Sequence, residues 1–138
     1  MADIALRVGV AVALAVDATI HWRLAEGYGL AFPGGVGGDT VFRAEAVLAV
    51  LVALYLLYRG SRPAWGAALT VLASAFIAVI VYRYVQVPQF GPIPSMYEPV
   101  WFTEKVIAAF AEAAGVMLAA VGLARVRHGR RGRRTSRN

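Results

Sequence analysis

Four long apolar segments alternate with shorter polar ones along this chain. The apolar segments run roughly over 4–22, 41–58, 64–85 and 100–123. Each approaches the length of about 20 residues that a helix needs to cross roughly 30 Å of hydrocarbon. The pattern predicts an all-α integral membrane protein, with one domain over 1–124 that folds as an up-down-up-down four-helix bundle.

The polar connections differ in length and in composition. The segment 59–63 reads Arg-Gly-Ser-Arg-Pro, a short turn that makes the second and third helices an antiparallel hairpin. The segment 23–40 contains a run of glycines after Pro33, and 86–99 contains four prolines. Because proline fixes φ and restricts the residue before it, the second long loop is predicted to be a stiff cap.

Composition agrees with a membrane protein and excludes several kinds of chemistry. The chain is 59% hydrophobic and 16% charged, with a mean hydropathy of +0.62. It has no cysteine, which excludes disulfides, thiolate catalysis and cysteine-ligated metals. Since His21 is the only histidine in an apolar segment, a haem held by two histidines of one chain is excluded too. No phosphate-binding loop or nucleophile elbow is visible, and no cofactor is expected.

Basic residues are distributed unevenly between the two ends of the predicted bundle. Ten lie near the termini or in the turn at 59–63, and four lie at the opposite end: Arg23, Arg43, Arg83 and Lys105. The positive-inside rule predicts a multi-pass plasma-membrane protein with both termini in the cytoplasm. The segment 125–138 carries seven arginines and is predicted to be a disordered basic tail that contacts anionic lipid headgroups. Nucleic acid is not an expected partner.

Ionisable residues inside the apolar segments are the candidate site. A charge near the bilayer centre costs at least about 2.5 to 3.5 kcal/mol, so such groups usually face the bundle interior. Glu45 is expected to point inward, whereas Arg43, two residues earlier, is expected to reach the headgroups. His21 follows Asp17 by one helical turn and shares its face. The candidate ligand-binding residues are Asp17, His21, Glu45, Arg83 and Glu112.

Depth separates these residues if interfacial tryptophans mark the membrane surface. Counted from Trp22, Asp17 is about 7 Å deep, and counted from Trp101, Glu112 is about 16 Å deep. This separation argues against a metal site. Without a cation within one turn on its own helix, Glu112 is expected to be protonated and to serve as a deep polar anchor. Alternatively, these charges are structural, with Glu112 ionised and paired with Arg83.

Several short stretches resemble the DoxX-like group of small four-helix bacterial membrane proteins. They are Ala5-Leu6-Arg7-Val8-Gly9, His21, Glu45 and Tyr97-Glu98-Pro99, within an overall layout that covers roughly 5–125. Another small four-helix family, of actinobacterial type, fits as well. The DoxX-like resemblance implies a membrane subunit linked to quinol oxidation or redox stress.

The sequence thus favours a non-catalytic subunit or a binder of a lipophilic ligand, either quinone or lipid, with a polar cavity that opens outward. A membrane-protein partner or a second copy of the chain is compatible with this hypothesis. The alternative is a proton-coupled transporter or a subunit of a membrane redox enzyme. A proton relay would need a second deep ionisable residue on the second or third helix, and none is predicted there.

Overall fold

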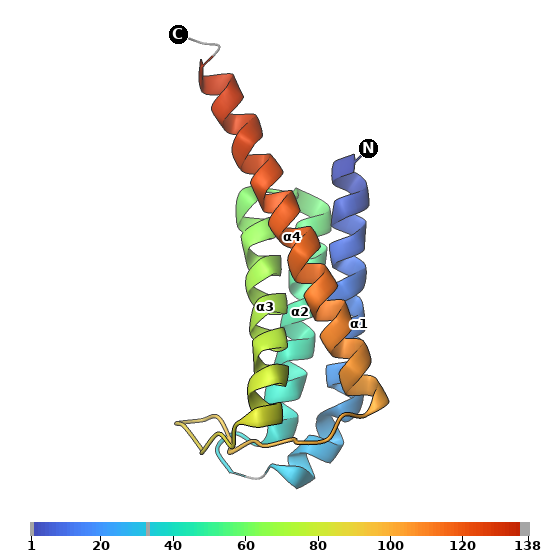
Figure 1. The fold of residues 1–138 in the computed structure, drawn as a ribbon, viewed down its shortest axis with the longest axis vertical. Helices are drawn as coiled ribbons and strands as arrows, with labels where there is room; N and C mark the ends of the chain where they lie inside the picture. Colours follow the sequence, from blue (N-terminus) through green and yellow to red (C-terminus); the bar gives the residue numbers. More distant parts are fainter. Residues whose placement is uncertain (1, 33, 136–138) are drawn as a thin grey trace.

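Four helices account for most of the computed structural model. It describes the backbone of 2–32 and 34–135 and the side chains of 3–32 and 34–126. The helices are α1 (Ala2–Ala31), α2 (Gly38–Arg59), α3 (Arg62–Tyr84) and α4 (Thr103–Thr135). They run alternately up and down, so the predicted all-α four-helix bundle is confirmed (Figure 1).

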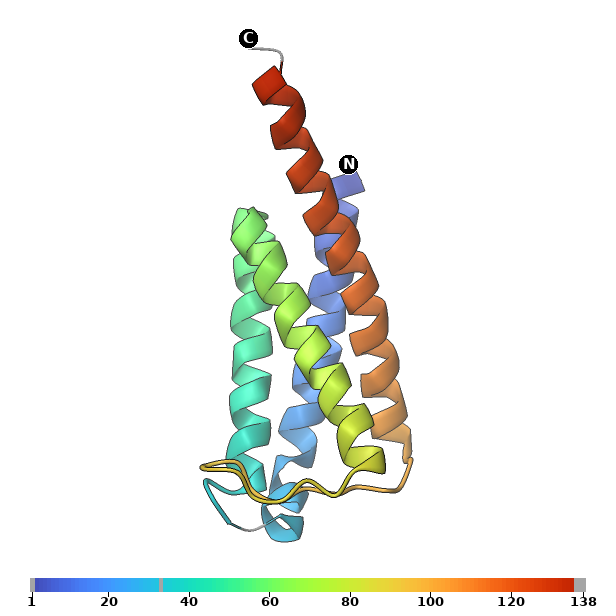
Figure 2. The same cartoon turned by 60° about the vertical axis from the view of Figure 1, so that its left-hand side comes forward.

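Each helix packs against two others around the bundle. α1 lies between α2 and α4, and α3 contacts the same two helices from the opposite corner (Figure 2). The N-terminus and the α2–α3 turn lie at one end, here called the terminal end. The α1–α2 and α3–α4 loops lie together at the other, here called the loop end (Figure 1).

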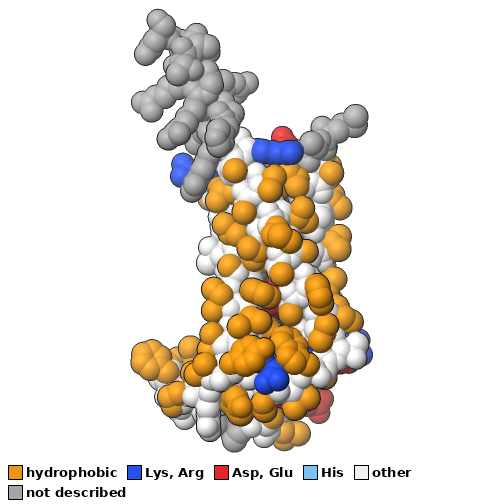
Figure 3. Space-filling model, in the orientation of Figure 1, with side chains coloured by type: hydrophobic (Ala, Val, Ile, Leu, Met, Phe, Trp, Pro, Cys, Tyr) orange, Lys and Arg blue, Asp and Glu red, His pale blue; other side chains and the backbone are white. Residues whose placement is uncertain are grey.

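The outward surface of the bundle is apolar along its length. Leu51 and Leu54 of α2 are 58% exposed, and Phe110 of α4 is 73% exposed. Hydrophobic side chains cover the visible face between the two ends, and most of the visible charge lies near those ends (Figure 3). All four helices are long and apolar enough to cross a membrane. The chain is therefore a multi-pass membrane protein whose outward side chains face lipid.

Small residues allow the helices to approach closely. A Cβ built on Gly115 would lie 2.7 Å from Leu72 and 2.9 Å from Ala13, and one on Gly122 would lie 2.3 Å from the Trp65 ring. Trp65 is only 2% exposed. Because lipid provides no hydrophobic driving force between helices, such tight packing is a main source of their association.

The α2–α3 turn forms as the sequence predicts. Gly60 ends α2 in the left-handed region at φ 52°, and its N–H donates to the carbonyl oxygen of Leu56. A side chain at this φ is strained. The guanidinium of Arg7 in α1 also lies against Gly60, so the turn is packed from the neighbouring helix.

The loop end differs from expectation in where the first helix ends. Residues 23–31 were predicted to be loop, but α1 continues through them to Ala31.

The α3–α4 loop forms a small hairpin, with bridges joining Val87 to Met96 and Phe90 to Ile93. The N–H of Val36 donates to the carbonyl oxygen of Pro92 at 2.8 Å, which ties the two long loops into one cap.

The fourth helix also extends further than predicted. It continues to Thr135, through residues that were predicted to belong to a disordered tail from 125 onward. Arginine is a good helix former, which is compatible with this continuation. The extension projects beyond the other helices at the terminal end (Figure 1), and residues 136–138 lie outside the described part of the chain.

Candidate functional site

A cavity of about 250 Å³ lies inside the bundle near the loop end. All four helices contribute to its wall, together with Met96 and Glu98 of the α3–α4 loop. Met96 is 3% exposed, so the loop packs onto the helices at this point. The proline-rich loop therefore covers part of this cavity.

Aromatic side chains form much of the cavity wall. Tyr28 stacks on Phe42 with ring centroids 4.0 Å apart, and Phe42 also lies 4.9 Å from the His21 ring. Phe32, just after α1, Tyr82 of α3 and Phe102, just before α4, also belong to this part of the lining. The remaining wall is mostly aliphatic, which makes the cavity suited to a flat apolar group.

Four acidic or basic side chains line the cavity: His21, Glu45 and Lys105 from three helices, and Glu98 from the α3–α4 loop. Glu45 points inward as predicted, while Arg43 is exposed and pairs with Asp39 at 3.4 Å. One buried carboxylate oxygen of Glu45 accepts no hydrogen bond from the described residues. The Lys105 ammonium donates to the carbonyl oxygens of Glu98 at 2.5 Å and Val100 at 3.4 Å. The apolar cavity thus contains a few convergent polar groups.

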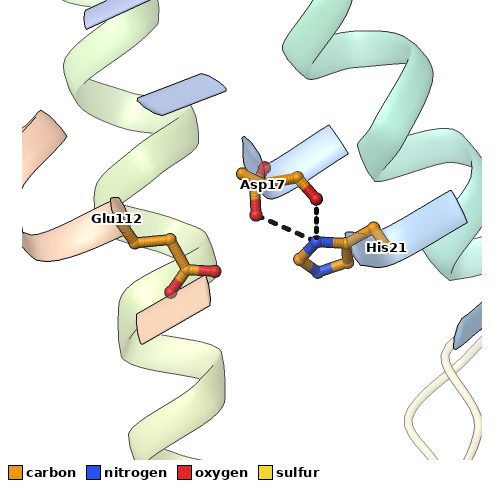
Figure 4. A group of neighbouring side chains, drawn as sticks. All are labelled: Asp17, His21 and Glu112. Carbon is orange, nitrogen blue, oxygen red and sulfur yellow. Dashed lines mark hydrogen bonds and ion pairs between the residues drawn. The ribbon is translucent and has the colours of Figure 1, made fainter. Parts of the chain in front are cut away.

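Asp17, His21 and Glu112 form a second group next to the cavity. His21 Nδ1 lies 2.9 Å from Asp17 Oδ1 and donates to the main-chain oxygen of Asp17 at 3.1 Å. Glu112 extends from α4 toward this pair on α1 (Figure 4). Each of the three residues offers one atom that could bind a metal ion, and these three atoms all lie within 4.8 Å of one another. Both carboxylates are 0% exposed, and neither oxygen of Glu112 accepts a hydrogen bond from the described residues.

The predicted separation in depth between Asp17 and Glu112 is wrong. Trp22 does not mark the end of α1, because Asp17 stands 14 residues before Ala31. That spacing corresponds to about 21 Å along the helix axis instead of 7 Å. The two carboxylates therefore meet at the same level of the bundle, and the argument from depth against a metal site no longer holds.

Arg83 lies apart from the other predicted site residues. Its guanidinium carbon is 5.0 Å from the centre of the Tyr84 ring, and the residue does not belong to the cavity wall. Among the described side chains, no ion pair joins Arg83 to Glu112. The geometry brings together four of the five predicted residues and leaves out Arg83.

Several cavity residues were not predicted as site residues, and the sequence carries a signal for two of them. Tyr28 follows His21 by seven residues and so lies on the same face of α1. Lys105 precedes Glu112 by seven residues and so lies on the same face of α4. Extending the seven-residue spacing from the buried groups identifies Tyr28 and Lys105 as candidates.

Comparison with known proteins adds no family to this description. No protein-family model matches the sequence, and neither the curated proteins nor the solved structures include a detectable relative.

Proposed function

We propose that this protein binds the head of a small lipophilic ligand, of quinone type, in the cavity at the loop end of the bundle. The observation that carries the proposal is the cavity itself: about 250 Å³, walled by aromatic rings and containing a few polar side chains. Small-molecule sites are typically concave and apolar, with a small number of polar groups that fix the orientation of the ligand.

The size of the cavity favours a single ring. An engineered apolar cavity of about 150 Å³ holds benzene, and this one offers about 250 Å³. Pockets that hold whole drug-sized ligands measure about 300 to 1,000 Å³. A substituted ring therefore fits inside, and a hydrocarbon tail attached to it would extend into the surrounding lipid.

The polar groups suit a ring that carries carbonyl oxygens. Such oxygens accept hydrogen bonds, and the Lys105 ammonium and the Tyr28 and Tyr82 hydroxyls are donors in the wall. Tyr28 and Phe42 offer flat faces for stacking. With such a cavity the protein would bind the ligand without acting on it, either alone or as a subunit of a membrane complex. The DoxX-like resemblance also implies a membrane subunit.

The proposed topology places the cavity on the outer side of the plasma membrane. Ten basic residues near the terminal end against four near the loop end support cytoplasmic termini. The ligand would then enter from the outer leaflet.

The test is a thermal-unfolding titration of the purified protein with a benzoquinone that carries a short isoprenoid tail. Ala78 lines the cavity, so Ala78→Phe should fill it, whereas Ala44→Phe adds the same side chain at an exposed position outside the wall. A ligand at 100 times its Kd stabilises a protein by about 2.7 kcal/mol. We expect the quinone to raise the midpoint of the wild type and of Ala44→Phe but not of Ala78→Phe.

If the quinone raises the thermal-unfolding midpoints of the wild type, Ala44→Phe and Ala78→Phe equally, it acts through the detergent or the lipid-facing surface. That result would contradict the proposal. A short-chain phospholipid that raises the midpoint in place of the quinone would assign the cavity to a lipid.

A further inference from the structure

Two fully buried carboxylates, Asp17 of α1 and Glu112 of α4, face a single imidazole. His21 pairs with Asp17 at 2.9 Å, and among the described residues no cation forms an ion pair with Glu112. An ionised carboxylate out of water and without a partner costs several kcal/mol. A divalent cation between the three side chains would pair with both carboxylates at once.

We propose that Asp17, His21 and Glu112 bind one first-row divalent transition-metal ion, with Zn²⁺ as the reference. Zn²⁺ accepts imidazole nitrogen and carboxylate oxygen, and three protein ligands are the usual number where one coordination position is kept open. Two carboxylates neutralise the charge of the ion. Ca²⁺ prefers six to eight oxygen ligands, so an imidazole within the group disfavours it.

The distances fit one ion after Glu112 moves inward. Two ligand atoms bound tetrahedrally at about 2.1 Å lie about 3.4 Å apart. His21 Nδ1 and Asp17 Oδ1 are 2.9 Å apart, and the ligand atoms of all three residues lie within 4.8 Å of one another. A movement of up to about 1.4 Å by Glu112, whose side chain points at the pair (Figure 4), closes the site. A ligand histidine is neutral, so binding through Nδ1 releases the proton that this nitrogen donates to the main-chain oxygen of Asp17.

The cavity reaches one of the three proposed ligands. His21 belongs both to this group and to the cavity wall, whereas Asp17 and Glu112 lie outside the wall. Glu45 and Glu98 in the wall attract cations, and Lys105 in the same wall repels them. An ion at Asp17, His21 and Glu112 would lie just behind the cavity, and its binding does not depend on the quinone-type ligand proposed above.

The experiment measures metal content and affinity on protein purified with a tag that lacks histidine. The sample is stripped with EDTA, dialysed against Zn²⁺ and analysed by elemental mass spectrometry, and Co²⁺ binding is followed by visible absorption. The wild type should retain one Zn²⁺ per chain. Loss of an outer partner of a metal ligand already weakens binding about 10- to 100-fold, so loss of a ligand in Asp17→Asn or Glu112→Gln should weaken Co²⁺ binding by at least about 100-fold.

The two histidines of the chain provide the matched control. His21→Gln should lose the ion, whereas His128→Gln, in the basic extension of α4, should retain it. A wild type with well below one equivalent of Zn²⁺ overturns the proposal, and this result does not require any variant to fold. Metal retained by Asp17→Asn and Glu112→Gln but lost by His128→Gln would also overturn it, because the ion would then belong to the extension.

Discussion

Replacing Gly122 with alanine tests how closely α3 and α4 pack. The new Cβ would lie 2.3 Å from Cζ3 of Trp65, and contacts under 3.0 Å force a shift of one group. The ring cannot move freely, because Trp65 is 2% exposed and part of the core. Overpacking of this kind costs about 1 to 3 kcal/mol, while alanine regains about 1 kcal/mol of helix propensity over glycine.

Gly66→Ala is the control, because a Cβ at Gly66 in α3 meets nothing within 4 Å. Both variants gain the same helix propensity, so the difference between them isolates the clash with Trp65. The free-energy difference can be converted to a difference in thermal-unfolding midpoint by the relation that holds for proteins of similar size. The midpoint of Gly122→Ala should lie roughly 3 to 10 °C below that of Gly66→Ala. The measurement is thermal unfolding in mild detergent, followed by circular dichroism at 222 nm.

A second variant separates the clash from other effects. In a Trp65→Leu background, which shortens the side chain, the penalty of Gly122→Ala should shrink, giving a non-additive double-mutant cycle. Equal midpoints for Gly122→Ala and Gly66→Ala would refute the close packing of α4 on the Trp65 ring.

Three further predictions concern the cap, the topology and the basic extension. Lys105→Met removes the donor to the Glu98 carbonyl oxygen, so amide hydrogen exchange over 86–102 should rise; unchanged exchange would show that the amine does not hold the loop. Cysteines at Ser95 and Ser136 of this cysteine-free chain should label from opposite sides of the membrane, and labelling of both by an impermeant reagent added outside cells would contradict the proposed orientation. Deletion of 128–138 should leave the unfolding midpoint nearly unchanged while weakening binding to anionic vesicles, and loss of folding would contradict the assignment of this segment as peripheral.

The choice of Ser95 for labelling comes from the structure. Gly37, in the other long loop, has φ 83°, and a Cβ there would lie 2.7 Å from the Asp39 side chain. Ser95 is exposed in the α3–α4 loop, and cysteine replaces serine with little change in shape.

The sequence predicts the parts of this fold that depend on local pattern. Apolar length identifies the four helices, the Arg-Gly-Ser-Arg-Pro turn identifies the hairpin, and helical spacing places His21 beside Asp17. The inward direction of Glu45 follows from the same spacing. Each of these depends on residues that are near one another in the chain, so periodicity and turn chemistry are sufficient.

The contact between Asp17 and Glu112 could not be obtained in this way. The level at which two helices meet depends on where each begins, and Trp22 was an unsuitable marker because α1 continues to Ala31. Gly27 and Gly29 weaken the helical signal in this stretch, since glycine lowers helix propensity by about 1 kcal/mol. Packing against the neighbouring helix and the loop cap overrides that preference, and a single sequence does not reveal such packing.

Native mass spectrometry of the protein released from membranes in mild detergent tests the central claim most directly. The claim is that the cavity of about 250 Å³ at the loop end holds one small lipophilic molecule. The account predicts a single adduct of small mass on the 14.7 kDa chain, with the fragmentation pattern of a quinone, present in Ala44→Phe and absent from Ala78→Phe. A wild-type spectrum that shows only the bare chain, or an adduct that persists in Ala78→Phe, would contradict it.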